Sequence, residues 1–208
     1  MKKIKKQVLS VLILLCLMVN TNVYAKSIKE IWTSLPDSML VYLDKNIRTE
    51  CINLMETGMK PEVTNKLGGK TKIDTLTSNF ISVTLTKAST LQIKLMPTQN
   101  DTILCVVHTF NAPVAESSIM LYTQEWEKIS DITFNIDSLI FKPDTMEQYE
   151  YEKLKLYMDP YLIKAELSPK SEYLIVSASI ANIASEDRDK INAILMQRKF
   201  KWNGYSFN

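Results

Sequence analysis

The stretch that decides the fold runs from Phe80 to Phe110 and contains three segments with the periodicity of β-strands. They read FISVTLTK (Phe80–Lys87), LQIKL (Leu91–Leu95) and TILCVVHTF (Thr102–Phe110). The first two alternate apolar and polar residues, which is typical of strands with one buried face. The third is apolar on both faces, which is typical of a central strand. Because only short turns separate the segments, we expect an antiparallel meander.

The strand pattern continues toward the carboxyl end. Further strands are predicted over Ser118–Tyr122, Trp126–Ile129, Ile132–Ile136, Tyr161–Leu167, Glu172–Ile180 and Lys199–Trp202. The turn Ser168-Pro169-Lys170-Ser171 joins two of them into a later β-hairpin. An Asn203-Gly204 turn gives the chain a hairpin-like ending.

Helical patterns precede and follow the predicted sheet in the sequence. Ser27 and Glu30 fit a capping box, which predicts a helix that Pro36 ends. A second helix is expected over about Ser38–Thr57, in one or two pieces. Asp144–Met158 is predicted to be helical, although part of it also alternates like a strand.

Ser185 is expected to cap a last helix. The sequence therefore predicts an α+β fold, with N-terminal helices packed on an antiparallel meander sheet, a later β-hairpin and a C-terminal helix.

The first 25 residues predict a cleavable signal peptide. Four lysines precede an apolar run from Val8 to Val19, and Val23 and Ala25 occupy the −3 and −1 positions of a cleavage site. The apolar run is too short for a spanning helix, which needs about 20 residues. We expect cleavage after Ala25 and export, leaving residues 26–208 as a single α+β domain.

The charge of the exported part is close to zero. Lys2, Lys3, Lys5 and Lys6 belong to the signal peptide, which has no acid, so the 25 basic and 23 acidic residues of the full chain become 21 and 23. This balance gives no electrostatic footprint for nucleic acid or for an anionic membrane surface.

Two cysteines remain after cleavage, Cys51 and Cys105. Export permits a disulfide between them. Both also fall on apolar faces, where unpaired cysteine behaves as a small hydrophobic residue. A disulfide and two buried thiols are both compatible with this pattern.

The motifs of common enzymes do not fit. Gly68-Gly69-Lys70-Thr71 lacks the earlier glycine of a phosphate-binding loop, because Thr64 stands there. His108 is the sole histidine, and on a strand it points away from Cys105. No Gly-x-Ser-x-Gly elbow occurs. We therefore predict no catalytic residue, no cofactor and no metal ligand.

Two groups of aromatic residues are candidate contact residues for a ligand or a partner. In Glu125-Trp126-Glu127 an aromatic side chain is flanked by acids, although alternation alone favours a core or edge tryptophan over a sugar-stacking platform. The second group is Tyr149, Tyr151, Tyr157 and Tyr161. Tyrosine is enriched at interfaces, and core packing is the simpler alternative here.

Four stretches of the chain carry a family resemblance: IWTSLPDS (Ile31–Ser38), GMK (Gly58–Lys60), VTNKL (Val63–Leu67) and Leu121-Tyr122 followed by Trp126. They resemble an uncharacterised secreted family of Bacteroidales gut bacteria. The resemblance implies export, and a periplasmic location because such bacteria are Gram-negative. It implies a small domain of unknown function and brings no catalytic motif.

Together these patterns favour a non-enzymatic binding or structural module of the cell envelope, which contacts a protein or an apolar ligand. The alternative is an envelope hydrolase that uses paired carboxylates near Trp126. Carboxylate chemistry of this kind depends on separation in space.

Overall fold

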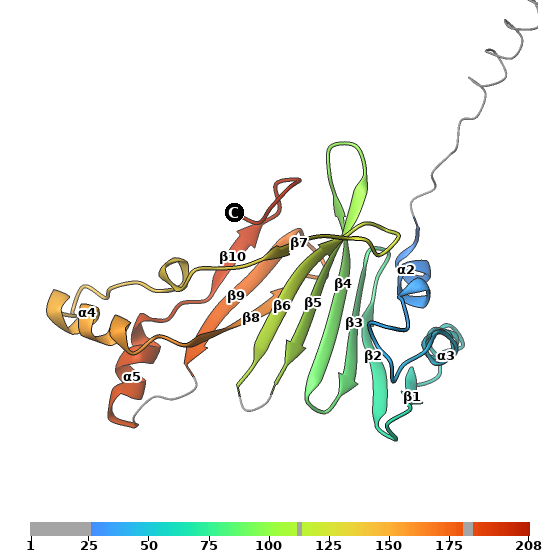
Figure 1. The fold of residues 1–208 in the computed structure, drawn as a ribbon, viewed down its shortest axis with the longest axis horizontal. Helices are drawn as coiled ribbons and strands as arrows, with labels where there is room; N and C mark the ends of the chain where they lie inside the picture. The colour runs from blue at the N-terminus through green and yellow to red at the C-terminus, as the bar shows by residue number, and fades with distance from the viewer. Residues whose placement is uncertain (1–25, 112–113, 181–184) are drawn as a thin grey trace, which may run out of the picture.

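A computed structural model describes residues 26–111, 114–180 and 185–208 (Figure 1). The predicted signal peptide, residues 1–25, lies outside the described residues. The described chain has the predicted α+β fold, with helices, a seven-stranded antiparallel sheet and a three-stranded antiparallel sheet.

The larger sheet is the predicted meander, in which every strand pairs with its neighbour in the sequence. Its strands are β1 (Glu62–Thr64), β2 (Lys70–Leu76), β3 (Phe80–Thr86), β4 (Ser89–Pro97), β5 (Thr102–Phe110), β6 (Glu116–Tyr122) and β7 (Lys128–Ile132). Strand β5 is buried on both faces: Leu104 and Val106 lie in one apolar cluster, and Cys105 and Val107 lie in another. The sheet is therefore covered on both sides.

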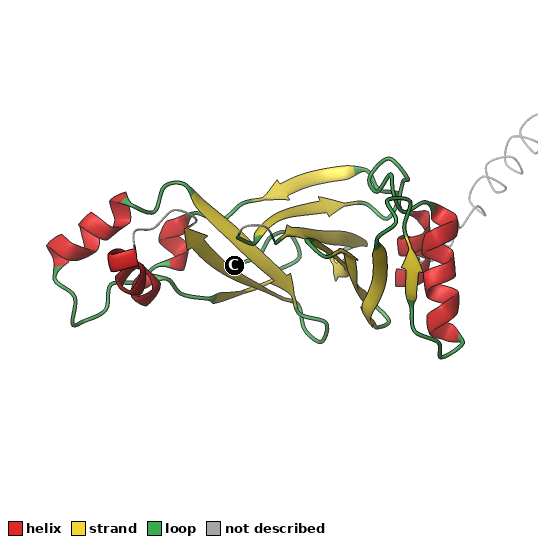
Figure 2. Cartoon of the chain, turned by 90° about the horizontal axis from the view of Figure 1, so that it is seen from below, coloured by secondary structure: helices red, strands yellow, loops and turns green. Residues whose placement is uncertain are grey.

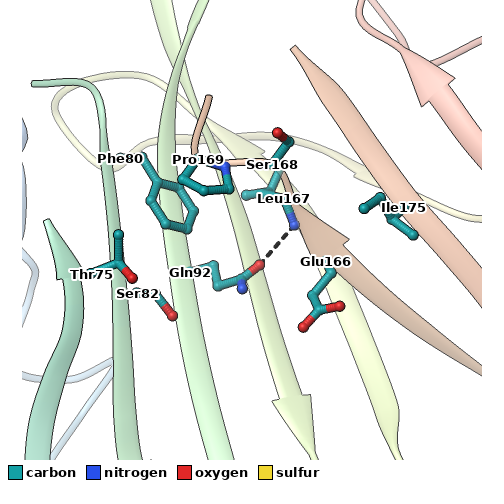
Figure 3. A pocket seen from close by; sticks show the side chains of 9 residues that line it. All are labelled: Thr75, Phe80, Ser82, Gln92, Glu166, Leu167, Ser168, Pro169 and Ile175. Atoms are coloured by element: carbon teal, nitrogen blue, oxygen red, sulfur yellow. Dashed lines mark hydrogen bonds between the residues drawn. The ribbon is translucent and has the colours of Figure 1, made fainter. Parts of the chain in front are cut away.

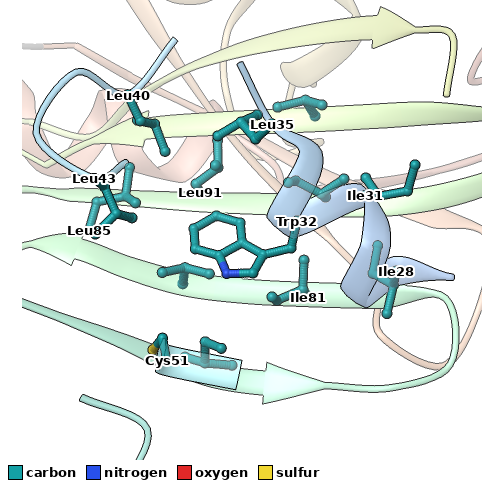
Figure 4. Close-up of a cluster of buried hydrophobic side chains, with 14 of the residues drawn as sticks. Ile28, Ile31, Trp32, Leu35, Leu40, Leu43, Cys51, Ile81, Leu85 and Leu91 are labelled. Carbon is teal, nitrogen blue, oxygen red and sulfur yellow. The ribbon is translucent and has the colours of Figure 1, made fainter. Parts of the chain in front are cut away.

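Two N-terminal helices, α2 (Ile28–Ser34) and α3 (Lys45–Glu56), cover one face at the β1–β4 end of the sheet. The predicted capping box of α2 is present, with Ser27 and Glu30 bonded reciprocally. Trp32 is fully buried among Ile81, Leu85 and Leu91 of the sheet (Figure 4). Burial of such large apolar side chains is the main force that holds the helices on the sheet.

A buried arginine joins these two helices. Arg48 of α3 is 1% exposed. Its guanidinium donates to the backbone carbonyls of Trp32, Thr33, Leu35 and Leu43 and to the carboxylate of Asp37. Most of these bonds go to carbonyls at and just after the end of α2, where a helix leaves C=O groups without helical partners. The bond to Leu43 is made just before α3 begins.

The smaller sheet packs on the opposite face of the meander. It has the order β10-β9-β8, with β8 (Tyr161–Leu167), β9 (Tyr173–Ile180) and β10 (Arg198–Lys201). Its inner side chains, among them Leu167, Val176 and nearby Trp202, share an apolar cluster with Cys105 and Val107 of the larger sheet. The predicted hairpin is thus confirmed, and β10 adds a third strand to it (Figure 2).

A third apolar cluster lies away from the larger sheet. The 3-10 helix η1 (Ile136–Leu139) leads toward it, and α4 (Gln148–Leu156) and α5 (Ser185–Ile194) build it around Leu154, Ile191 and Ile194. Figure 1 shows these helices at the end of the molecule opposite α2 and α3. In the described ranges, no helix has the length and apolar character needed to cross a bilayer.

The structure differs from the sequence prediction at three places. The second helix begins only at Lys45, because Asp44 caps it by accepting from the backbone N–H groups of Asn46 and Ile47. Strands β1 and β2 were not predicted, since their lysine and threonine residues obscure the alternation. In place of the predicted strands Trp126–Ile129 and Ile132–Ile136, the structure has a turn at Trp126, one strand, β7, and a 3-10 helix that begins at Ile136.

Candidate functional site

The candidate site follows the edge of β8 that faces away from β9; β8 is one of the two edge strands of the smaller sheet. Ser168, just after β8, donates its backbone N–H to Tyr173 O. In an antiparallel pair the hydrogen-bonded residues alternate, so the even-numbered residues of β8 direct their backbone groups toward β9. The odd-numbered residues therefore direct their backbone N–H and C=O groups away from β9. Two of these N–H groups meet side chains of the larger sheet: Ala165 donates to Ser117 Oγ (3.0 Å) and Leu167 donates to Gln92 Oε1 (2.8 Å).

Two neighbouring cavities lie beside this edge, between β8 and the face of strands β2–β5. One has a volume of about 260 Å³ and includes Thr75 and Ser82 in its lining. The other, of about 170 Å³, includes Thr90 and Thr109. Gln92 and Glu166 line both, so the two cavities are neighbours along the β8 edge, and the larger one is drawn in Figure 3.

A third cavity of about 300 Å³ continues the line toward the start of β8. It is more aromatic, because Phe134 and Tyr161 line it together with Ile163. The Tyr161 hydroxyl donates to the backbone carbonyl of Phe134 (3.4 Å), which links the Tyr161 side chain to the backbone of the segment that carries Phe134. We refer to the three cavities as the β8 groove.

A buried lysine supports the rim of the groove. Lys94 is 1% exposed, and its Nζ donates to Ser168 O at 2.6 Å and lies 5.7 Å from the centroid of the Phe80 ring. Burial lowers the pKa of the Lys94 ammonium, and the Glu172 carboxylate partly offsets this effect. Phe80 and Ser168 both line the groove, so the contacts that Lys94 makes with them hold this part of the lining in position.

The structure places Trp126 in the core that lies under α2. Its side chain is 8% exposed, packs on the ring of Tyr122 and donates from Nε1 to Ser34 Oγ (3.4 Å). Its backbone has φ of 67°, in the left-handed region, so it stands in a turn and not on a strand. The neighbouring Glu125 is exposed and forms an ion pair with Lys26.

The four tyrosines of the predicted contact group are not brought together at one surface. Tyr149 is 83% exposed on α4, whereas Tyr151 packs against the third apolar cluster. Tyr157 follows α4 and is 48% exposed. Tyr161 is the member of the group that lines the β8 groove.

The two cysteines are free thiols in the structure. Cys51 lies in the cluster beneath the helices and Cys105 in the cluster beneath the smaller sheet, on opposite faces of the meander. Burial raises the pKa of both thiols, that of Cys105 to about 12. Among the described residues, no group of three or more His, Cys, Asp or Glu side chains is arranged to hold a metal ion.

His108 is half-buried on the helix-bearing face of β5. Its ring lies 4.3 Å from that of Phe110, and in the described part of the chain its Nε2 has no hydrogen-bond partner. Burial lowers the pKa of the imidazole below its ordinary value of 6.5. The folded protein therefore resists protonation of this ring more than the unfolded chain does.

Replacement of His108 by glutamine is expected to make the stability less sensitive to acid. In the wild type, the unfolded chain binds the proton first, so stability is lost as the pH falls from 6.5 to the lowered pKa and is unaffected above 6.5. Urea unfolding at about pH 7.5 and about pH 5 measures the loss. An equal loss in wild type and His108→Gln would contradict the assignment.

The residues that the sequence did not single out are Gln92, Ser117 and Glu166. Gln92 and Glu166 stand at polar positions of alternating strands, which suggested solvent-facing side chains. The signal that could have found them is the run of hydroxyl and amide residues on one face of β3 and β4, namely Ser82, Thr90 and Gln92.

The fold and the site define an α+β protein whose smaller sheet leaves a polar groove along its edge. The chain belongs to the family described as "Protein of unknown function (DUF3256)", whose family model matches residues 20–207. It is similar to a solved structure described as a domain of an uncharacterized protein from Porphyromonas gingivalis W83. The TM-score is 0.72 at 22% identity, over 86% of this chain and 97% of that one.

That likeness shows the fold alone. No curated protein matches the chain.

Proposed function

We propose that the protein is an exported, non-enzymatic binding module of the cell envelope, and that it holds its ligand or partner in the β8 groove. The observation that carries this proposal is the alignment of three cavities along one strand edge, two of them sharing Gln92 and Glu166. Ligand sites in proteins are concave, and a small number of placed polar groups orient the ligand in them.

Export is part of the proposal. Cleavage after Ala25 would leave Lys26 as the amino terminus. Its backbone nitrogen lies 2.8 Å from Gln124 Oε1, and its Nζ lies 3.1 Å from the carboxylate of Glu125. A new terminal ammonium would thus find an acceptor in place. A periplasmic location follows if the source is a Gram-negative bacterium, as the resemblance to a secreted Bacteroidales family implies.

The alternative of a hydrolase with carboxylates near Trp126 remains a prediction from the sequence. The indole that would have stacked on a sugar is packed under α2, and Glu125 is paired with Lys26. These contacts favour the binding module.

A groove-filling substitution tests the proposal. Ser82 lies half-buried on the floor of the groove, so Ser82→Trp should fill the space, whereas Ser118→Trp places the same bulk at an exposed position on the opposite face of the meander. Each protein is expressed with residues 1–25, recovered from the envelope fraction and analysed by native mass spectrometry.

The expected result is a bound species on wild type and Ser118→Trp that Ser82→Trp loses, with unchanged melting temperatures. Retention of the same species by Ser82→Trp would remove the groove from consideration. The same spectra give the amino terminus, expected at Lys26. A protein that begins at Met1 and stays in the cytosol would contradict export.

A further inference from the structure

We propose that the ligand of the β8 groove is a short, neutral, hydroxyl-rich chain, that is, an oligosaccharide. This inference rests on the proposed function and names the chemical class of its ligand. It follows from the hydrogen-bonding groups of the lining, from the state of the β8 edge, from the charges and from the aromatic end of the groove.

The polar part of the groove offers hydroxyl, amide and carboxylate groups side by side. Because Gln92 Oε1 already accepts from Leu167 N–H, the remaining Nε2 carries two donors for a ligand. Figure 3 shows the carboxylate of Glu166 and the hydroxyls of Thr75 and Ser82 around the same space. A sugar hydroxyl both donates and accepts, so it can use acceptor and donor groups of this kind together.

The state of the edge disfavours an extended peptide. A peptide strand that adds to a sheet edge takes its affinity from backbone hydrogen bonds. Here the outward N–H groups of Ala165 and Leu167 already donate to Ser117 and Gln92. A docking strand would have to displace both bonds, whereas a ligand that binds to side chains would leave them intact.

The charges along the groove disfavour an acidic ligand. Its charged lining residues are Lys164, Glu166 and Glu116, one cation and two anions. An anionic polymer would meet an excess of like charge, while a neutral one would meet only hydrogen-bonding partners.

The aromatic end gives the ligand an apolar contact. Tyr161 and Phe134 line the third cavity and are both partly exposed. The C–H face of a sugar ring can pack on such rings while its hydroxyls remain bonded elsewhere. Tyr161 and Glu166 are five residues apart on one strand, about 17 Å at 3.4 Å per residue. A ligand that contacts both residues must therefore be several linked rings long.

Calorimetric titration of the full chain, expressed with its natural amino-terminal segment, tests the inference. The probes are chitotetraose, cellotetraose and maltotetraose, each at millimolar concentration, and the blocked peptide acetyl-hexaalanine-amide. At least one tetrasaccharide is expected to bind. Glu166→Ala and Tyr161→Leu should each weaken that binding about tenfold or more, the loss of a hydrogen bond to a charged group or of a ring contact.

Glu127→Ala is the matched control, because Glu127 is exposed and stands next to Trp126, away from the groove. It should leave the affinity unchanged, and all three variants should melt as the wild type does. Failure of all three tetrasaccharides to bind would overturn the inference, and so would sugar binding that neither groove variant weakens.

Binding of the peptide alone, abolished by Ser82→Trp, would overturn the oligosaccharide and leave the proposed function standing. The proposed function itself would be contradicted by a species that binds the native protein and is still bound by Ser82→Trp.

Discussion

Replacing Arg48 with methionine is expected to lower the free energy of unfolding by about 3–5 kcal/mol. The methionine keeps the length of the side chain and most of its apolar contacts, so the loss isolates the guanidinium. Four backbone carbonyls and the Asp37 carboxylate accept hydrogen bonds from this single group. Without the guanidinium, the buried carbonyls near the end of α2 lose their hydrogen-bond donor. Because they are buried, water does not replace it, and an unpaired buried carbonyl costs free energy.

Urea unfolding followed by circular dichroism measures this effect. Arg198→Met is the matched control, since Arg198 is exposed on β10, and its change should stay within about 0.5 kcal/mol. Arg48→Lys should fall between the two, because an ammonium keeps the charge but cannot reproduce the planar fork of donors. A loss below about 1 kcal/mol for Arg48→Met would mean that the loop after α2 does not depend on these bonds.

Replacing Trp202 with alanine is expected to cost a similar amount, about 3–5 kcal/mol, for a different reason. Trp202 follows β10 and is 3% exposed, and its ring packs edge-on against Phe207 at 5.1 Å. Its Nε1 donates to Pro97 O at 2.6 Å, at the far end of β4. Truncation leaves a cavity between the two sheets and an unpaired carbonyl.

Trp202→Phe separates these two contributions. It keeps a large ring, so most of the packing should survive, and it removes the hydrogen bond to Pro97, which is worth about 1 kcal/mol. Equal losses for alanine and phenylalanine would show that the hydrogen bond dominates and the packing does not. Both variants are compared with the wild type by urea midpoint, with the slope checked for a change in the surface exposed.

The larger sheet could be predicted from the sequence because its signal is local. Ile81, Val83 and Leu85 alternate with polar residues, and Val106 and Val107 mark the doubly buried strand, with no need to know what lies above or below. The N-terminal helix was equally local, since Ser27 and Glu30 cap it within one turn.

The candidate site could not be predicted because it depends on which face the smaller sheet covers. Gln92 and Lys94 alternate with apolar residues as solvent-facing side chains would, yet β8 and the turn at Ser168 lie over them. Nothing local to β4 indicates this cover. The backbone of Trp126 was assigned to a strand because its segment continues a strand pattern, whereas it lies in a turn with a left-handed backbone; the core position that was favoured for its side chain agrees with the structure.

The two side chains that occupy the outward N–H groups of β8 have a consequence for crowded solutions. An unpaired strand edge is a template on which identical molecules can join sheet to sheet and grow into filaments. Gln92 and Ser117 occupy two N–H groups of that template, those of Leu167 and Ala165, from within the same molecule. We therefore expect substitution of these two side chains to cause self-association at high protein concentration before it lowers the melting temperature of the isolated chain.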